Sequence, residues 1–181
     1  MSAASGAYLG TSDFAATVLG ILASSGHRPA LAVTLPDRKQ GRGRKVSPSP
    51  VATAAEELGI EVFKCGDVNL PEARERILAA GGEWASICAF GQLIKEPLLT
   101  DLPMLNVHPS LLPRWRGAAP IERSIMAGDE QTGVCVMRLV AGLDSGRLGR
   151  SLVVDAGNQG AARGLDVEAF GDLVGDLLDP H

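Results

Sequence analysis

The amino-acid sequence predicts an α/β protein with an open, mainly parallel sheet and helices on both faces. Short apolar segments alternate with longer segments of helical periodicity, and turn residues separate them. The 22 glycines and 11 prolines among 181 residues disfavour an all-helical bundle, because both residue types are concentrated in turns. This length accommodates one domain with a single hydrophobic core.

Six strands are expected, each a short apolar run bounded by turn residues. They cover residues 7–9, 30–34, 60–63, 84–90, 104–108 and 134–140. The run at 84–90 is apolar except for Ser86, which is typical of a central strand buried on both faces. In the last strand, alternation places Val134, Val136 and Arg138 on one face.

Four helices are expected between these strands, and start or stop residues mark them. They cover residues 13–25, the stretch between Ser49 and Gly59, 70–80 and 119–127. Ser49 is suited to cap the second helix, and a proline stands in the first turn of each of the last three. A glycine follows the end of every helix, at Gly26, Gly59, Gly81 and Gly128.

The chain changes character after Gly146. The last 35 residues contain no Lys and no Ile and are rich in Gly, Asp and Ala. Only 152–154 have the pattern of a weak strand, and 165–178 that of a short acidic helix. We therefore expect the sheet to be incomplete at its C-terminal end.

Composition limits the location and class of the protein. Seventeen Lys and Arg against 21 Asp and Glu give a formal net charge of −4, and 45% of the residues are apolar, which disfavours wholesale disorder. No apolar run approaches the roughly 18 residues of a membrane-spanning helix. The first six residues lack the basic and apolar regions of a signal peptide. We expect a cytoplasmic protein without a membrane partner.

Cysteine and histidine usage gives no metal or disulfide pattern. Cys65, Cys88 and Cys135 are odd in number and far apart, so we expect three buried small hydrophobic residues. With only three histidines, a multi-histidine metal site is disfavoured. We expect no metal cofactor.

Polar residues concentrate where the later strands end. Asn106 and His108 are two residues apart on one strand and so share a face, and Asp144 follows the last strand. Ligands of open parallel sheets bind beyond the carboxyl ends of the strands. An amide, an imidazole and a carboxylate suit acyl transfer to an amine, with direct attack by the substrate. The alternative is that Asn106 and His108 only satisfy backbone groups at a strand end.

Two further segments are candidates for nucleic-acid contact. Residues 38–45 hold five basic residues in eight, between prolines and with internal glycines, which predicts a protruding loop able to reach phosphates. The alternative is a solvated loop without a partner. In residues 110–120, Trp115 stands between Arg114 and Arg116 and is either a stacking surface or a core anchor.

Several of these segments together resemble the methionyl-tRNA formyltransferase family, within the wider group of formyltransferases that use 10-formyltetrahydrofolate. Asn-x-His-Pro-Ser at 106–110 and the later Asp are shared by the wider group. Leu-Leu-Pro-Arg-Trp-Arg-Gly-Ala-Ala-Pro and Gly-Arg-Gly-Arg-Lys are more specific to its tRNA-acting branch. The matching segments are residues 10–15, 36–38, 41–45, 47–51, 89–92, 106–120 and 142–146.

The resemblance implies a Rossmann-like formyltransferase fold and transfer of a formyl group from 10-formyltetrahydrofolate to the α-amine of methionyl initiator tRNA, a step of translation initiation. Asn106 and His108 would stabilise the developing oxyanion, and Asp144 would orient His108 or relay a proton. The implied folate-binding residues are Phe90, Gly91, Gln92, Leu93, Ser110, Leu111, Leu112, Pro113, Val140, Gly142 and Leu143. The implied tRNA-binding residues are Arg38, Arg42, Arg44, Lys45, Arg114 and Arg116.

The C-terminal part departs from the family pattern. We expect residues 1–146 to form the N-terminal catalytic domain and 147–181 an atypical tail of a truncated or frame-shifted product, without the family's C-terminal β-barrel domain. A monomer is expected. Two alternatives to tRNA formylation stay open: an inactive remnant or folate-binding module, and a formyltransferase acting on a small-molecule amine.

Overall fold

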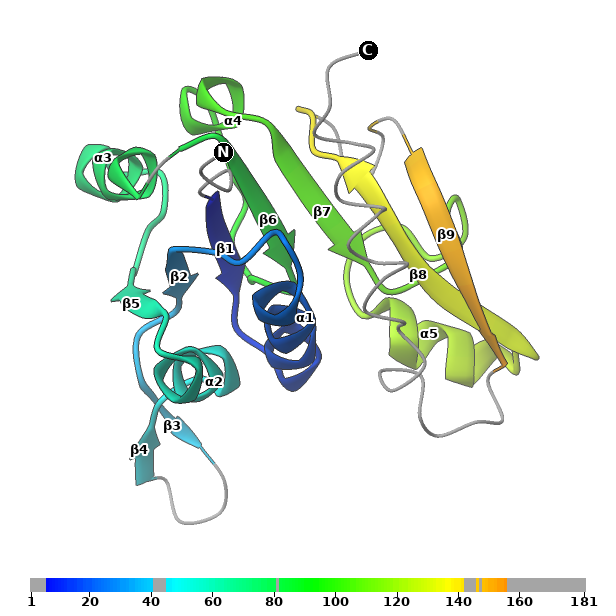
Figure 1. Ribbon diagram of the computed structural model, residues 1–181. Helices are drawn as coiled ribbons and strands as arrows, with labels where there is room; N and C mark the ends of the chain where they lie inside the picture. The colour runs from blue at the N-terminus through cyan, green and yellow to red at the C-terminus, as the bar shows by residue number, and fades with distance from the viewer. Residues whose placement is uncertain (1–5, 41–44, 81, 142–145, 147, 156–181) are drawn as a thin grey trace.

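The fold is seen in a computed structural model that describes residues 6–40, 45–80, 82–141, 146 and 148–155 (Figure 1). Seven strands form the main sheet: β1 (Gly6–Gly10), β2 (Leu31–Thr34), β5 (Glu61–Lys64), β6 (Trp84–Cys88), β7 (Met104–His108), β8 (Gln131–Arg138) and β9 (Leu148–Asp155). The helices are α1 (Asp13–Ser24), α2 (Pro50–Leu58), α3 (Pro71–Ala79), α4 (Leu98–Asp101) and α5 (Pro120–Ala127). Two short strands, β3 (Arg38–Gln40) and β4 (Lys45–Ser47), form a separate hairpin.

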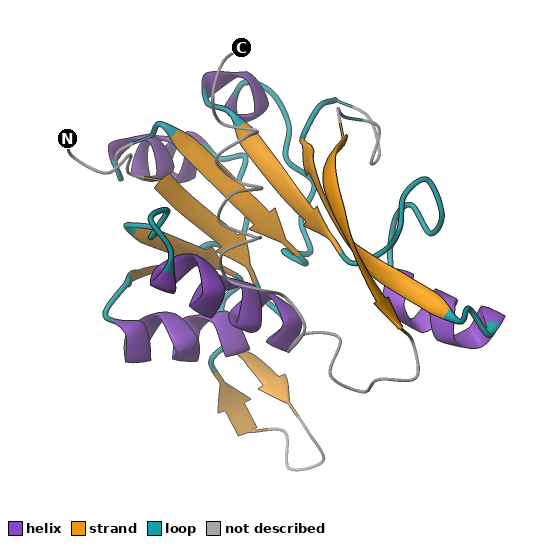
Figure 2. Ribbon diagram, turned by 45° about the vertical axis from the view of Figure 1, so that its right-hand side comes forward, coloured by secondary structure: helices purple, strands orange, loops and turns teal. Residues whose placement is uncertain are grey.

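The strand order of the main sheet is β5-β2-β1-β6-β7-β8-β9. Neighbours from β5 to β7 are parallel, whereas β8 runs antiparallel to β7 and β9 antiparallel to β8. Helices α1 and α2 pack on one face in a core cluster around Tyr8 and Leu105. Helices α3 and α4 pack on the other face around Leu9 and Ile87 (Figures 1 and 2). The predicted fold class is confirmed.

Local signals place most elements close to where the sequence predicts them. The Ser49 hydroxyl caps α2 by accepting a hydrogen bond from the backbone N–H of Ala52 at 3.0 Å. Gly59 ends the same helix with φ of +67°, a left-handed conformation that suits glycine. The strand expected at 84–90 ends at Cys88, because the next residue, Ala89, has φ of +42° and turns the chain out of the sheet.

The structure corrects the expectation that the basic segment at residues 38–45 is a loop. Arg38 pairs with Ser47 and Lys39 with Val46 in an antiparallel hairpin, so the flanks of the segment are strands. Apolar alternation is weak there, and backbone pairing across the hairpin forms the strands instead. Residues 41–44 lie outside the described part. Figure 2 shows the hairpin projecting away from the main sheet.

The sheet extends beyond Gly146. Strand β9 covers eight residues, where the sequence suggests only a weak strand at 152–154. Its register with β8 runs from Gln131 opposite Asp155 to Met137 opposite Leu148. The first residues of β9 are mostly polar, so the sequence shows no apolar pattern there. The strand forms because the edge of β8 offers it backbone hydrogen bonds.

The described residues bear on two expectations, one about the cysteines and one about membrane-spanning helices. Cys65, Cys88 and Cys135 are all buried and unpaired as free thiols, as predicted. Helices in the described ranges are too short or too polar to cross a membrane.

Candidate active site

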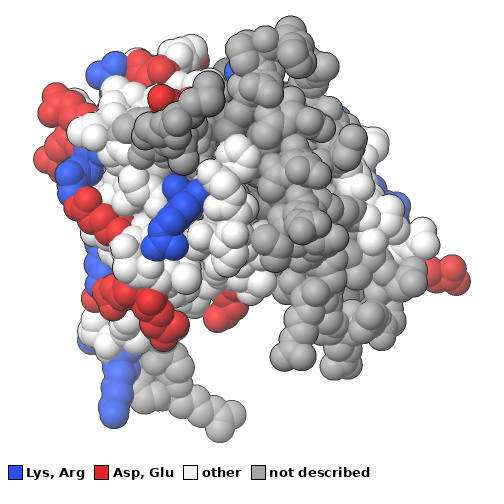
Figure 3. Space-filling model, in the orientation of Figure 1, with Lys and Arg blue, Asp and Glu red and all other residues white. Residues whose placement is uncertain are grey.

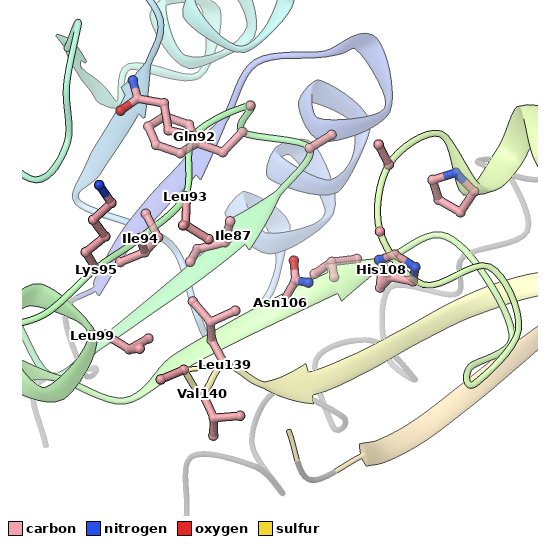
Figure 4. A pocket seen from close by; sticks show the side chains of 18 of the residues that line it. Ile87, Gln92, Leu93, Ile94, Lys95, Leu99, Asn106, His108, Leu139 and Val140 are labelled. Atoms are coloured by element: carbon pink, nitrogen blue, oxygen red, sulfur yellow. The ribbon is translucent and has the colours of Figure 1, made fainter. Parts of the chain in front are cut away.

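A cavity of about 930 Å³ lies at the carboxyl ends of β6 and β7, the edge of a parallel sheet where ligands usually bind (Figure 4). Its lining consists of residues 89–96, 106–109, 117–120 and 139–141, together with Ile87 and Leu99. Most of these groups are apolar, and a few polar groups converge among them.

Asn106 and His108 both line this cavity from β7, as their two-residue spacing predicts (Figure 4). His108 is 6% exposed, and its Nε2 lies 2.9 Å from the backbone oxygen of Trp115. Asp144, the third member of the predicted set, lies outside the described residues, as do Gly142 and Leu143. The structure therefore brings together the amide and the imidazole of the set.

The segment after β7 turns its tryptophan toward an acidic partner. Trp115 has φ of +62° and is half-buried, and its indole Nε1 donates to Asp129 Oδ2 at 2.6 Å. Arg114 donates to both oxygens of the same carboxylate, at 2.9 and 2.7 Å, and its guanidinium lies 4.3 Å from the centre of the Trp115 ring. These donors, Arg114 first, lower the pKa of the Asp129 carboxyl.

This geometry argues against a core anchor at Trp115. The ring is only half-buried, Arg114 lies over it, and its indole N–H binds Asp129. The Arg114 and Arg116 side chains are both exposed, and Arg114 is engaged by Asp129.

Four predicted folate-binding residues, Ser110 to Pro113, lie outside the lining of the cavity. Ser110 is fully buried, and its hydroxyl donates to the backbone oxygen of Arg114 at 2.7 Å. Leu111 instead borders a smaller cavity of about 300 Å³, next to Trp115 and Asp129. In place of this segment, Pro109 and residues 117–120 contribute to the main cavity.

The other predicted wall of the cavity is formed by the loop after β6. Phe90, Gly91, Gln92 and Leu93 all line the cavity, as does Val140 on the facing side. Positive φ values at Ala89 and at Gly91 (+83°) curve this loop around the opening. The Thr11 hydroxyl donates to the Phe90 carbonyl at 2.9 Å and so ties the loop to the turn before α1.

Polar contacts clamp this loop to the connection between β5 and α3. The Gln92 side chain accepts from the Val68 N–H at 2.8 Å and donates to two carbonyls of the same connection, at 3.2 and 3.3 Å. From the connection between β5 and α3, the Asn69 side chain in turn bonds to the loop: it accepts from the Lys95 N–H at 2.8 Å and donates to the Leu93 carbonyl at 3.0 Å. The Gln92 amide thus supports the cavity wall, and so does Asn69, which is not among the residues predicted from the sequence.

Asp67 in turn holds Asn69. Its Oδ1 accepts from both the backbone and the side-chain amide of Asn69, at 2.9 and 3.1 Å, and these contacts lower the pKa of the Asp67 carboxyl. The Asp-x-Asn spacing that permits such a turn is the one signal the sequence offers for this contact, and it is common in loops.

The predicted tRNA-binding residues divide between two places. Arg38 and Lys45 are exposed on the hairpin, and Arg42 and Arg44 lie outside the described residues. Figure 3 shows basic side chains at the end of the molecule formed by β3 and β4. Arg114 and Arg116 belong instead to the segment beside the cavity.

Two observations concern metal-binding groups and thiols among the described residues. They contain no group of three His, Cys, Asp or Glu side chains placed to hold a metal ion. Burial raises the pKa of the Cys88 thiol to about 12, so the thiol at the end of β6 is protonated at neutral pH.

Comparison with known proteins gives relatives along most of the chain. Residues 7–157 match the formyl transferase family, a range that includes β9. Methionyl-tRNA formyltransferase from Methylococcus capsulatus is 47% identical over 141 residues, covering 77% of this chain and 46% of the relative. The enzyme of the same name from Roseobacter denitrificans is 45% identical over 153 residues, covering 83% and 50%. The chain spans about half the length of the curated relatives it matches.

Solved structures share the fold at lower identity. Phosphoribosylglycinamide formyltransferase from Streptococcus pneumoniae has a TM-score of 0.72 at 15% identity, covering 96% of this chain and 98% of that one. A sugar N-formyltransferase from a Shewanella species has a TM-score of 0.64 at 14% identity, covering 96% and 69%. The sequence match over 7–157 and the relatives at 45–47% identity lead to one conclusion: this chain belongs to the formyl transferase family.

Proposed function

We propose that this chain provides the catalytic part of a formyltransferase that moves a formyl group from 10-formyltetrahydrofolate to the amine of methionyl initiator tRNA. The observation that carries the proposal is the placement of Asn106 and His108 in one cavity at the ends of the parallel strands. The curated relatives at 45–47% identity support the choice of substrate, since they are methionyl-tRNA formyltransferases.

The cavity suits the donor in size and chemistry. Ligand sites of this kind measure roughly 300–1,000 Å³ and combine apolar walls with a few placed polar groups. Phe90, Leu93 and Val140 supply apolar surface. The backbone of the loop after β6 would supply hydrogen-bonding groups for a ring edge. The donor would supply the formyl group, and the walls would hold and orient it.

Each polar residue has a proposed role in the transfer. The Asn106 amide would donate a hydrogen bond to the formyl oxygen, where negative charge grows as the amine attacks. His108 would stabilise the same charge or move a proton, and Asp144 would orient it. Attack by the substrate amine itself suits this site, since its polar groups resemble proton carriers more than nucleophiles.

The basic hairpin is the proposed contact for tRNA phosphates. Arg38 and Lys45 are exposed there, and the proposal extends to Arg42 and Arg44 between them. Near the cavity, Arg116 is the better candidate for a phosphate contact than Arg114, because Asp129 already engages Arg114. This contact would be local, because screening at physiological salt limits such interactions to roughly 8–10 Å.

A formylation assay with the 181-residue chain tests the proposal. We expect transfer of labelled formyl from the donor to methionyl initiator tRNA, reduced by about 10²-fold or more in His108→Ala. His27→Gln is the matched control, because His27 packs edge-on against Trp84 outside the cavity lining. Loss of turnover in both variants would point to unfolding, which circular dichroism would detect.

The same assay separates the alternative functions. Donor binding by calorimetry without transfer to any amine would indicate a folate-binding module and refute the enzymatic proposal. Transfer to a small amine but not to tRNA would refute the proposed substrate. Arg38→Gln with Lys45→Gln should weaken tRNA binding and lower its salt dependence while leaving donor binding unchanged.

A further inference from the structure

We infer that Asp129 is a positioning residue for His108 and acts through Trp115. Asp129 comes from the turn after α5, 21 positions along the chain from the histidine, and neither the motif nor the cavity lining includes it. The inference rests on the proposed function, in which His108 takes part in formyl transfer.

The connection consists of two hydrogen bonds joined by one residue. On one side, the Trp115 backbone oxygen lies 2.9 Å from His108 Nε2. On the other, the Trp115 indole donates to Asp129 Oδ2 at 2.6 Å. The indole therefore holds the residue whose carbonyl meets the imidazole.

The carbonyl selects one form of the imidazole. A carbonyl oxygen only accepts hydrogen bonds, so His108 Nε2 must carry the hydrogen. In the neutral ring, Nδ1 is then the nitrogen with the lone pair, and the partner of one ring nitrogen sets the role of the other. The Trp115 carbonyl thus fixes the hydrogen on Nε2, and its direction contributes to the orientation of the ring.

The backbone of Trp115 needs outside support to keep that direction. A φ of +62° is unfavourable for a bulky residue and persists where surrounding contacts enforce it. Asp129 supplies such contacts, since its carboxylate accepts hydrogen bonds from the indole and from Nε and Nη2 of the preceding Arg114. The carboxylate is 15% exposed, so these bonds are partly shielded from water.

Asp129 is itself fixed by the end of α5. The helix stops at Gly128, which has φ of +68°, and the Asp129 N–H donates to the Ser124 carbonyl at 3.0 Å. Pro120 at the start of the same helix lines the cavity. One short helix therefore places both part of the cavity wall and the carboxylate that supports Trp115.

The test compares variants that break the connection at different points. Asp129→Ala removes the acceptor of the indole, and Trp115→Phe removes the indole N–H while keeping a ring. We expect Asp129→Ala to lower kcat by about tenfold to a hundredfold with KM for the donor unchanged, since small displacements of catalytic groups cost rates of this order. Asp129→Asn keeps an acceptor oxygen and should restore most of kcat.

A second bidentate Arg–Asp pair provides the matched control. Arg74 binds both oxygens of Asp101 and neither residue lines the cavity, so Asp101→Ala removes the same chemistry at another place. We expect Asp101→Ala to leave kcat unchanged. If Asp101→Ala lowers kcat as much as Asp129→Ala, the effect is one of general stability and the inference is wrong.

A double-mutant cycle and nitrogen-15 NMR of His108 complete the test. In the Trp115→Phe background, Asp129→Ala should lower kcat by a clearly smaller factor than in the wild-type background, because the indole hydrogen bond is already lost and only the Arg114 contacts remain. Full additivity would overturn the inference, as would unchanged His108 nitrogen shifts in Asp129→Ala. The NMR readout requires no turnover, so an inactive wild-type chain would refute the proposed function while the positioning of His108 is still tested.

Discussion

Ser86 carries a buried hydroxyl in the central strand β6. The residue is fully buried, lies between Tyr8 and Leu105 on the neighbouring strands, and its Oγ has no hydrogen-bond partner among the described residues. Burying a hydroxyl without a partner costs about 1–3 kcal/mol. Ser86→Ala removes that cost and leaves a void of one oxygen atom, worth on the order of 0.3 kcal/mol. We expect the free energy of unfolding to rise by about 1 kcal/mol.

Ser110→Ala is the matched comparison, with the opposite expected sign. Ser110 is equally buried, but its hydroxyl donates to the Arg114 carbonyl at 2.7 Å. Its removal leaves that carbonyl without this donor, and we expect a loss of about 1–2 kcal/mol. Urea denaturation with equal m-values measures both changes, and 1 kcal/mol corresponds to roughly 2–4 °C in Tm at this chain length. If Ser86→Ala destabilises the protein as much as Ser110→Ala, the reasoning about the unpaired hydroxyl fails.

Three further substitutions test the cavity wall, an ion pair and a close contact. Asn69→Ala releases the Leu93 carbonyl, so steady-state kinetics should show a several-fold higher KM for the donor at constant kcat. Arg74 lowers the pKa of Asp101 in the folded state. The pair therefore stabilises the fold above the unfolded pKa near 3.9, and this contribution disappears as the pH falls through the folded pKa. In urea unfolding, Asp101→Asn should lower the free energy of unfolding at pH 7 and change it little at pH 2–3. Gly10→Ala would place a Cβ 2.9 Å from a side chain of α1 and 3.0 Å from a β6 carbonyl, and calorimetry should show a lower Tm from about 1–3 kcal/mol of overpacking.

Local sequence was sufficient where the determining interactions are local. Ser49 and Gly59 mark the ends of α2, because capping depends on residues within one turn. Asn106 and His108 share a cavity, because residues two apart on a strand face the same side. The same reasoning could not find β9, whose polar first residues become a strand by pairing with β8.

The sequence by itself determined the alternation of strands and helices, the strand carrying the proposed catalytic pair and the family motifs around it. The tertiary structure alone decided that Gln92 supports the cavity wall, that Ser110 to Pro113 lie outside the lining, and that Asp129 meets Trp115. The physical reason is range. Periodicity and capping act over a few residues, whereas these contacts join segments 14 or more positions apart, which become neighbours only once the sheet and helices have packed.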